Sequence, residues 1–212
     1  MPRLELVIGD KRISSWSLRP WLLLRQAELP FRETSVRLRQ PDTRDQILKH
    51  SPSGKVPLLK DGDLVVWDSL AICDYVASLV PERNFWPADR AARAHAMSIT
   101  AEMHAGFPDL RRDLSMDVLQ VVPTPDLPPE TLRDIARIQE IWRDCRSRAQ
   151  GGPFLFGAFT VADAFYAPVV TRFVTYSVSV DPVCRAYMDA MLALPAMQEW
   201  REGAEAEERA RA

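Results

Sequence analysis

The strongest fold signal in this protein is the segment Lys55-Val56-Pro57-Leu58-Leu59-Lys60-Asp61-Gly62-Asp63-Leu64-Val65-Val66-Trp67-Asp68-Ser69. Two apolar runs, residues 56–60 and 64–67, flank the pair Asp61-Gly62, which is a strong signal for a β-hairpin. Asp68-Ser69 follows directly and predicts the start of a helix over residues 70–79, because both residue types are preferred at helix N-termini. The segment therefore predicts two strands and a helix in close succession.

The residues before this hairpin change their periodicity about every ten positions. Residues 4–8 form a short apolar run ending at Gly9, which predicts a buried strand. Residues 18–27 have a helical pattern that tolerates Pro20, since a proline in the first turn removes no hydrogen bond. Residues 31–38 alternate like a strand, and residues 43–50 predict a short polar helix. The predicted order is β-α-β-α-β-β-α.

After Pro87 the pattern changes to long helical segments broken by proline and glycine. Asp89 predicts the start of a helix that runs to about Leu119 with a kink at Pro108. The remaining predicted helices are residues 128–150, 161–175, 181–192 and 195–206, followed by a charged tail at 205–212. We therefore expect a mixed α/β domain at residues 1–80, a linker at 81–88 and an all-helical domain at 89–212.

The composition is that of an average globular protein and argues against several classes of function. The chain has 47% hydrophobic and 26% charged residues, with a formal net charge of −2. No basic run exceeds two residues, so the positive charge that a nucleic-acid backbone requires is missing. No window approaches the ~18 to 20 apolar residues that span a bilayer. We expect no nucleic-acid or membrane partner and a cytoplasmic location.

The cysteines and histidines do not indicate a metal centre. The cysteines lie far apart without a C-x-x-C pair, and the histidines have no metal-ligand spacing; these residues are Cys73, Cys145, Cys184, His50, His95 and His104. The sequence therefore predicts no metal site, no disulfide framework and a reducing compartment.

Three serines precede the first predicted helix, in Ser14-Ser15-Trp16-Ser17. Capping of the helix is one interpretation, because serine is a preferred N-cap residue. The alternative is that a hydroxyl at the positive end of the helix stabilises a thiolate. Three hydroxyl groups are more than one cap requires, so both interpretations stay open.

The hairpin segment contains three further candidate binding features. Pro57 is either a proline at a strand edge or part of a cis peptide bond that leaves the Val56 backbone free to pair with an extended peptide. Ser69 is either the helix N-cap or, with Asp68, a site for a carboxylate and an ammonium group. Lys55 is either a solvated surface lysine or a point charge for a second carboxylate.

Together these motifs resemble the cytosolic glutathione S-transferases over essentially the whole chain. The resemblance rests on Ser14-Ser15-Trp16-Ser17-Leu18-Arg19, Lys55-Val56-Pro57, Asp68-Ser69-Leu70-Ala71-Ile72 and the capping box Thr160-Val161-Ala162-Asp163. It is greatest to the serine-type bacterial, zeta and tau branches. It implies a thioredoxin-like N-terminal domain that binds glutathione, and a helical C-terminal domain that lines the electrophile site.

The resemblance also implies roles for individual residues. Ser14 matches the catalytic serine, with Ser15 and Ser17 as alternatives. Val56, which precedes Pro57, would pair its backbone with the cysteinyl unit of glutathione. Asp68 and Ser69 would hold the γ-glutamyl ammonium and carboxylate, and Lys55 would face the glycyl end. Trp16, Phe107 and Arg111 are the candidates for the second-substrate pocket, although a helical stripe such as that around Phe107 is more often core.

The implied function is a glutathione transferase in which a serine hydroxyl activates the glutathione thiol for attack on a small hydrophobic electrophile. Glutathione would be a co-substrate and no other cofactor is expected; the family further implies a homodimer and a role in detoxification. The alternatives are a non-catalytic binding module with the same fold and a glutathione-dependent isomerase of the zeta type. Trp16 stands where the zeta pattern has a cysteine, which weakens the isomerase interpretation.

Overall fold

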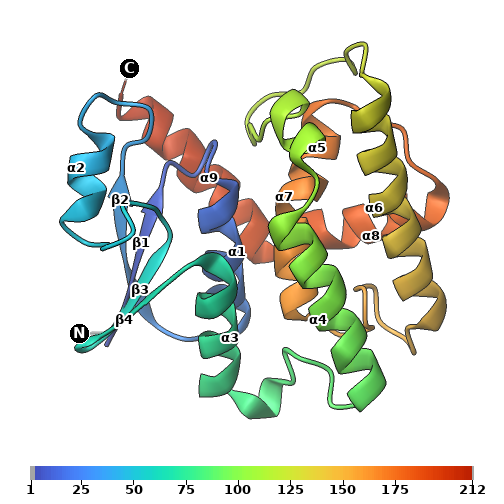
Figure 1. Cartoon of the computed structure of the whole chain (residues 1–212), viewed down its shortest axis with the longest axis horizontal. Helices are drawn as coiled ribbons and strands as arrows, with labels where there is room; N and C mark the ends of the chain where they lie inside the picture. Colours follow the sequence, from blue (N-terminus) through green and yellow to red (C-terminus); the bar gives the residue numbers. More distant parts are fainter. Residues whose placement is uncertain (1–2, 212) are drawn as a thin grey trace.

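The computed structural model describes residues 3–211; residues 1, 2 and 212, which the predicted domains and tail include, lie outside it. Figure 1 shows a mixed sheet with its helices on one side of the molecule and a group of helices on the other. This arrangement confirms the predicted fold class, a small α/β part followed by an all-helical part.

The sheet has four strands in the order β2-β1-β3-β4, namely β1 (Leu4–Gly9), β2 (Phe31–Val36), β3 (Leu58–Asp61) and β4 (Leu64–Trp67). β1 and β2 are parallel, whereas β3 is antiparallel to both β1 and β4. Alternate side chains of β1 point to opposite faces, so Leu6 and Ile8 join the large core and Val7 joins a small second core. The hairpin at Asp61-Gly62 forms as predicted.

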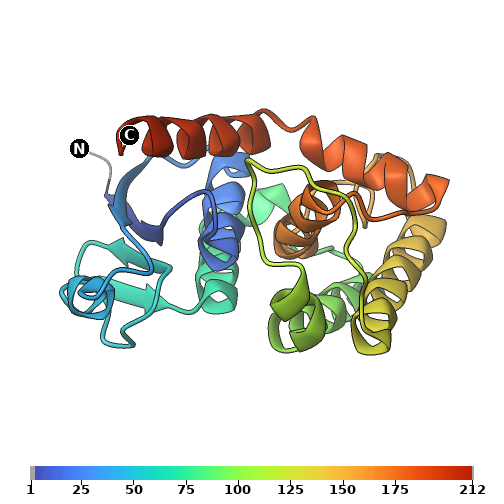
Figure 2. The same ribbon diagram turned by 90° about the horizontal axis from the view of Figure 1, so that it is seen from above.

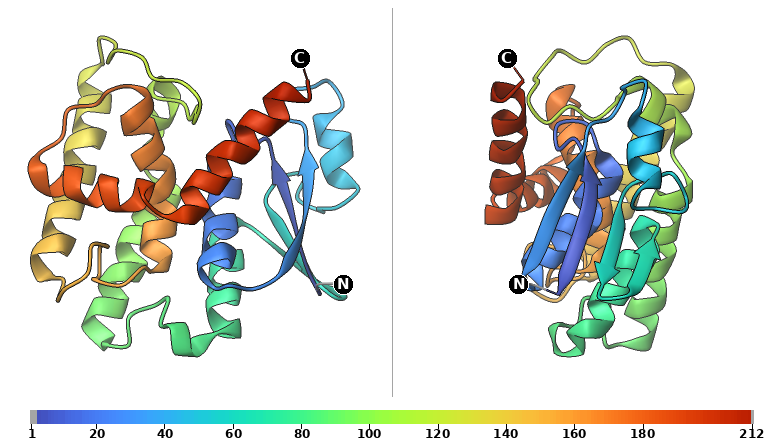
Figure 3. Two further views of the ribbon diagram at one scale, coloured as in Figure 1. Left: turned by 180° about the vertical axis from the view of Figure 1, so that it is seen from behind. Right: turned by 90° about the vertical axis from the view of Figure 1, so that its left-hand side faces the viewer.

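Three helices cover the sheet: α1 (Ser15–Gln26), α2 (Thr43–Leu48) and α3 (Ser69–Leu79). α1 and α3 lie on one face and α2 on the other, as Figure 3 shows. The predicted order β-α-β-α-β-β-α is confirmed. α1 begins at Ser15, earlier than the apolar pattern predicted, because the Leu18 N–H already donates to the Ser14 carbonyl. Serine residues therefore form the first turn.

The second part of the chain contains six α-helices within the described residues: α4 (Arg90–Ala105), α5 (Pro108–Asp113), α6 (Pro129–Arg148), α7 (Val161–Thr175), α8 (Pro182–Leu192) and α9 (Pro195–Arg209). A short 3₁₀ turn, η1 (Pro81–Arg83), follows α3. α7 is buried along almost its whole length and packs against α1 and α4. None of the helices within residues 3–211 combines the length and the apolar character needed to cross a membrane.

The prediction of one kinked helix from Asp89 to Leu119 is wrong. α4 ends at Ala105, and Phe107 then adopts the left-handed conformation with φ of 59°. Pro108 begins the separate helix α5. Proline has no backbone N–H, but at the first position of a helix this group would have no acceptor within the helix, so no hydrogen bond is lost. The residues after Asp113 are not helical as far as Pro128. The left-handed residue turns the chain, so the two helices do not share one axis.

The charged tail predicted at residues 205–212 is instead largely the last turn and a half of α9. Figure 2 shows α9 running from the helical half across to the sheet. Glu207 Oε2 accepts the Lys11 N–H at 3.0 Å, and Glu208 forms an ion pair with Arg12 at 2.8 Å. These acids therefore bind the loop between β1 and α1, which explains why the end of the chain is ordered as helix.

The capping box at the start of α7 forms as predicted. The buried carboxylate of Asp163 accepts hydrogen bonds from the Thr160 N–H at 2.8 Å, the Thr160 hydroxyl at 2.8 Å and the Leu155 N–H at 3.0 Å. One side chain thus holds both the helix start and the preceding loop.

We expect Asp163→Ala to lower the free energy of unfolding by about 3 kcal/mol, because it leaves two buried N–H groups without acceptors. Urea unfolding followed by circular dichroism measures the change. Asp189→Ala, at an exposed position of α8, is the matched control and should change stability by less than about 0.5 kcal/mol. Equal effects of the two substitutions would contradict the assigned role of Asp163.

Candidate functional site

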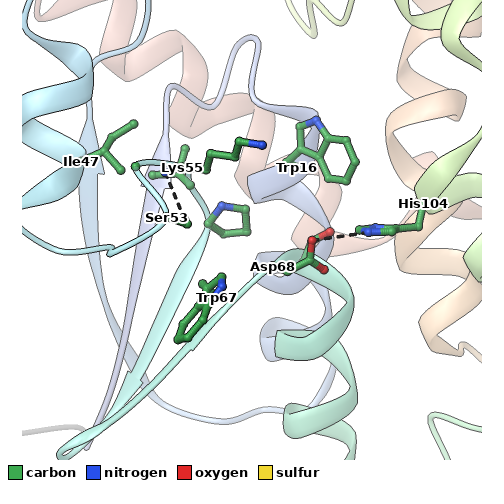
Figure 4. Close-up of a pocket in the computed structure, with 11 residues that line it drawn as sticks. Trp16, Ile47, Ser53, Lys55, Trp67, Asp68 and His104 are labelled. Atoms are coloured by element: carbon green, nitrogen blue, oxygen red, sulfur yellow. Dashed lines mark hydrogen bonds and ion pairs between the residues drawn. The ribbon is translucent and has the colours of Figure 1, made fainter.

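A cavity of about 770 Å³ lies where the two halves of the chain meet, between the start of α1, the loop before β3, the start of α3 and one face of α4 (Figure 4). Its lining residues are Trp16, Ile47, Ser53, Gly54, Lys55, Val56, Pro57, Trp67, Asp68, Ser69 and His104. The structure therefore brings together the predicted features of the hairpin segment and Trp16, although they come from two separate parts of the sequence.

The Val56–Pro57 peptide bond is cis, which was one of the two interpretations of this proline. The Val56 N–H and C=O lie before the first paired residue of β3 and have no hydrogen-bond partner within residues 3–211. Lys55 is exposed at the edge of the cavity, and its own N–H donates to the Ser53 hydroxyl at 3.2 Å. An extended backbone in the cavity could pair with Val56.

Asp68, and not Ser69, is the N-cap of α3. Asp68 Oδ1 accepts the Leu70 N–H at 2.8 Å, while its Oδ2 lies 3.4 Å from Nε2 of His104. Ser69 is buried, and its hydroxyl oxygen accepts a hydrogen bond from Nη1 of Arg19 at 3.4 Å. Because Asp68 caps the helix, the Ser69 hydroxyl is not used for capping.

The three serines at the start of α1 are buried and do not line the cavity. Ser14 occupies the N-cap position, yet its side chain makes no capping hydrogen bond. Its hydroxyl donates to the Ser17 hydroxyl oxygen at 2.7 Å, which also accepts the Gly9 N–H at 3.0 Å. Helix capping thus accounts for none of the bonds that these Ser14 and Ser17 hydroxyls make.

Of the three residues predicted for a second-substrate pocket, the structure brings two together. Trp16 lines the cavity with 37% of its surface exposed, and the Arg111 guanidinium lies over its ring at 5.1 Å. Arg111 also donates to two carbonyl groups at the end of α4, those of Gly106, at 3.0 Å, and Met103. Phe107 is buried at the break between α4 and α5 and is not among the lining residues.

Several lining residues were not identified from the sequence. Ser53, Gly54 and Trp67 adjoin predicted site residues, so their position next to Lys55 and Asp68 was the available signal. His104 and Ile47 come from helices that no local motif connects with the hairpin. Arg19 lies directly beneath the cavity, with its guanidinium 4.2 Å from the centre of the Trp16 ring.

The protein lowers the pKa of His104 and raises the pKa values of the three cysteine thiols. Burial lowers the pKa of His104, the Asp68 carboxylate partly offsets this effect, and Arg19 and Arg111 lower the pKa further. Burial raises the pKa of all three cysteine thiols, to about 12 for Cys145 and Cys184 and higher still for Cys73. The protein's own thiols are therefore protonated at neutral pH.

Across residues 3–211, no three His, Cys, Asp or Glu side chains form a group that could hold a metal ion.

Comparison with known proteins identifies the class to which this two-part fold belongs. Residues 13–79 match the family model for the glutathione S-transferase N-terminal domain, and residues 128–203 match that for the C-terminal domain. The chain belongs to the glutathione S-transferase family.

Individual relatives agree with this assignment. The Escherichia coli (strain K12) protein "Glutathione S-transferase GstB" is 29% identical over 58% of this chain and 58% of its own length. A Caenorhabditis elegans protein named "Probable maleylacetoacetate isomerase" is 28% identical over 51% of this chain and 48% of its own length. The chain therefore spans about half of the length of these curated relatives.

A solved structure of a glutathione transferase homologue from Burkholderia GL BGR1, with bound glutathione, has the same fold. It superposes with a TM-score of 0.72 and 20% sequence identity, over 97% of this chain and 99% of that chain. At this identity the superposition shows the fold alone.

We expect His104 to titrate below its ordinary pKa of 6.5, and Asp68→Asn to lower its pKa further because the carboxylate favours the imidazolium form. Proton NMR of the histidine ring hydrogens over a pH series measures both values, with His104→Gln identifying the signal. Because folding lowers this pKa, the unfolded chain binds the proton more tightly, so His104 reduces stability as the pH falls through 6.5. An unchanged titration in Asp68→Asn would contradict the contact.

Proposed function

We propose that this protein is a glutathione transferase that binds glutathione in the cavity between α1, β3 and α3. The observation that carries the proposal is the meeting of Val56, Lys55, Asp68 and Ser69 around one cavity of about 770 Å³. A free backbone N–H and C=O, a lysine, a carboxylate and a hydroxyl are complementary to a tripeptide with one ammonium and two carboxylate groups.

The proposed pose follows from these chemical groups. The unpaired backbone of Val56 forms strand-like hydrogen bonds with the cysteinyl unit. The γ-glutamyl carboxylate lies at the start of α3 near Ser69, where helix N–H groups favour an anion, and its ammonium faces Asp68. Lys55 attracts the glycyl carboxylate at the exposed edge of the cavity. This pose directs the cysteinyl sulfur toward the start of α1.

In the proposed reaction, the Ser14 hydroxyl donates a hydrogen bond to the glutathione sulfur and favours loss of the thiol proton to water. The thiolate then forms a bond from its sulfur to the electrophilic atom of the second substrate, whose leaving group departs with the electrons of the broken bond. For this step the hydroxyl must turn from its hydrogen bond with Ser17 toward the cavity. The positive end of α1 further stabilises the anion because no side chain caps it. Ser15 and Ser17 remain the alternative donors.

The second substrate is proposed to be a small hydrophobic electrophile that contacts the exposed face of Trp16, which lines the cavity. Phe107 would enter this pocket only if the segment between α4 and α5 moved, since its side chain is buried here. The similarity to the C. elegans protein keeps glutathione-dependent isomerisation as a second candidate function, which product analysis distinguishes from transfer.

We expect the ultraviolet absorbance of the thiolate to appear when glutathione binds the wild-type protein at neutral pH, and to be lost in Ser14→Ala. Loss of a hydrogen bond to a charged sulfur should also lower kcat with a standard aromatic electrophile by about tenfold or more. Ser15→Ala and Ser17→Ala test the alternative donors under the same conditions. Ser17→Ala should keep the signal, because it releases the Ser14 hydroxyl from its present partner.

The possible outcomes separate the alternatives. An equal thiolate signal in wild type and Ser14→Ala would exclude Ser14 as the donor, and loss in Ser15→Ala or Ser17→Ala would assign the role to that residue. Calorimetric titration that detects no glutathione binding to the folded protein would favour the non-catalytic binding module over the enzyme.

A homodimer is also proposed, with the face formed by α3 and α4 as the contact. This face contains an apolar groove lined by Leu70, Trp86 and Met97. Met97 has 48% of its surface exposed and lines this groove, so the two form one contiguous apolar surface, the kind that a partner can cover.

We expect the wild-type protein to sediment at about twice the mass of one chain and Met97→Glu to sediment as a monomer, because a buried carboxylate without a partner opposes association. Leu132→Glu is the matched control: Leu132 is equally exposed but lies on α6, on the far side of the helical half (Figure 1). Association that is unaffected by Met97→Glu would show that another surface forms the dimer.

The domain limits at residues 1–80, 81–88 and 89–212 and a cytoplasmic location are further proposals. The limits are supported by the position of η1 and its flanking loops between the last helix of the sheet layer, α3, and the first helix of the other half, α4. The location is supported by three cysteines that are all free thiols.

A further inference from the structure

Arg19 is a fully buried arginine on α1, directly beneath the cavity. Its guanidinium is packed between two aromatic rings, 4.2 Å from the centre of the Trp16 ring and 4.5 Å from that of Phe165. Because Phe165 belongs to α7 of the helical half, the guanidinium is held from both halves of the molecule and cannot turn to solvent. Its position relative to the start of α3 is therefore fixed.

The hydrogen bonds of Arg19 are incomplete. Nη1 donates to the Ser69 hydroxyl oxygen at 3.4 Å, whereas Nε and Nη2 are buried and have no partner among the described residues. Burial and the charge of Arg111 lower the pKa of Arg19 to about 9, so the side chain still carries its charge at pH 7. A buried charge without a counter-ion is energetically costly, which indicates that another group compensates it.

Neighbouring groups within residues 3–211 provide only part of that compensation, because Asp68 raises the pKa of Arg19 by less than burial and Arg111 lower it. The Cys73 thiol is buried and protonated at neutral pH, because burial raises its pKa. Asp68 is the nearby carboxylate, but its two oxygens face the Leu70 N–H and the His104 ring. Arg111 also lies against Trp16 and adds a further positive charge. His104 contacts the same ring and is either neutral or positive, so it adds no negative charge. The missing negative charge is therefore best supplied by a ligand.

We propose that Arg19 is a positioning residue that acts through Ser69 to bind the carboxylate of the γ-glutamyl unit of glutathione. This inference rests on the proposed binding of glutathione. Since the Ser69 oxygen accepts the hydrogen bond from Arg19, its hydroxyl proton is free to be donated to the ligand carboxylate. The positive charge of Arg19 lies behind the Ser69 hydroxyl and the ligand carboxylate, in a site shielded from water. It therefore favours the ionised form of that carboxylate.

The test compares Arg19→Met with the wild-type protein on two ligands. One is glutathione, and the other is 4-aminobutyryl-cysteinyl-glycine, which is glutathione without the α-carboxylate of its glutamyl unit. We expect Arg19→Met to weaken the binding of glutathione by about tenfold to a hundredfold, the range for a hydrogen bond to a charged group. We expect it to change the binding of the analogue less than about twofold, because the group that Arg19 serves is missing.

Two further measurements separate this role from a structural one. In turnover, Arg19→Met should raise KM for glutathione and leave kcat almost unchanged, since Arg19 does not act on the sulfur. Its melting temperature without ligand should be equal to or above that of the wild type, because replacing an uncompensated buried charge by an apolar side chain does not destabilise. Arg25→Met, on the same helix but outside the cavity, should resemble the wild type in all of these measurements.

Each result supports or overturns the proposal. Equal loss of affinity for both ligands in Arg19→Met would overturn it, since the effect would then be a general disturbance of the cavity. Unchanged affinity for glutathione would overturn it as well. If Arg19→Met does not fold, Arg19→Gln, which keeps the length and loses the charge, is measured with the same two ligands and the same criteria. Wild-type protein that does not bind glutathione at all would instead overturn the proposed function.

Discussion

The burial of α1 between the sheet and the helical half is the constraint on which the candidate site depends. Every residue of this helix from Ser17 to Leu24 is buried, and the helix packs against α3, α7 and α9. Figure 3 shows α9 crossing α1 on the face away from α4. A helix with contacts on so many sides cannot shift without losing packing in the large core, against both the sheet and the helical half. The serines at its start and Arg19 in its second turn therefore have fixed positions relative to α3.

The same packing creates an imbalance of charge at the cavity. Arg19 and Arg111 both lie against Trp16, and the carboxylate that faces this region, that of Asp68, is shared with His104. A peptide with two carboxylates and an ionisable thiol reduces this imbalance when it binds. The proposed ligand and the proposed role of Arg19 therefore have one electrostatic origin, the excess of cationic groups where the two halves meet.

Local motifs were predictable because their interactions join residues that are close in sequence. The hairpin at Asp61-Gly62 and the capping box at Thr160 and Asp163 form as expected, since each depends on residues three or four positions apart. The break at Phe107 was missed because the apolar periodicity continues across it, while the left-handed conformation of a single residue turns the chain. The acids of α9 were misread as a tail because their partners, Lys11 and Arg12, lie at the other end of the sequence.

From the sequence alone follow the order of the elements, the two-part architecture and the family, because these depend on composition, periodicity and short motifs. Only the tertiary structure shows that His104 reaches Asp68, that Arg19 lies beneath Ser69 and that Ser14 donates to Ser17. It also separates Phe107 from the cavity residues, among which the family resemblance had placed it. The physical reason is that these contacts join α1, α3 and α4 through packing, and no short-range pattern records which side chains packing brings within hydrogen-bond distance.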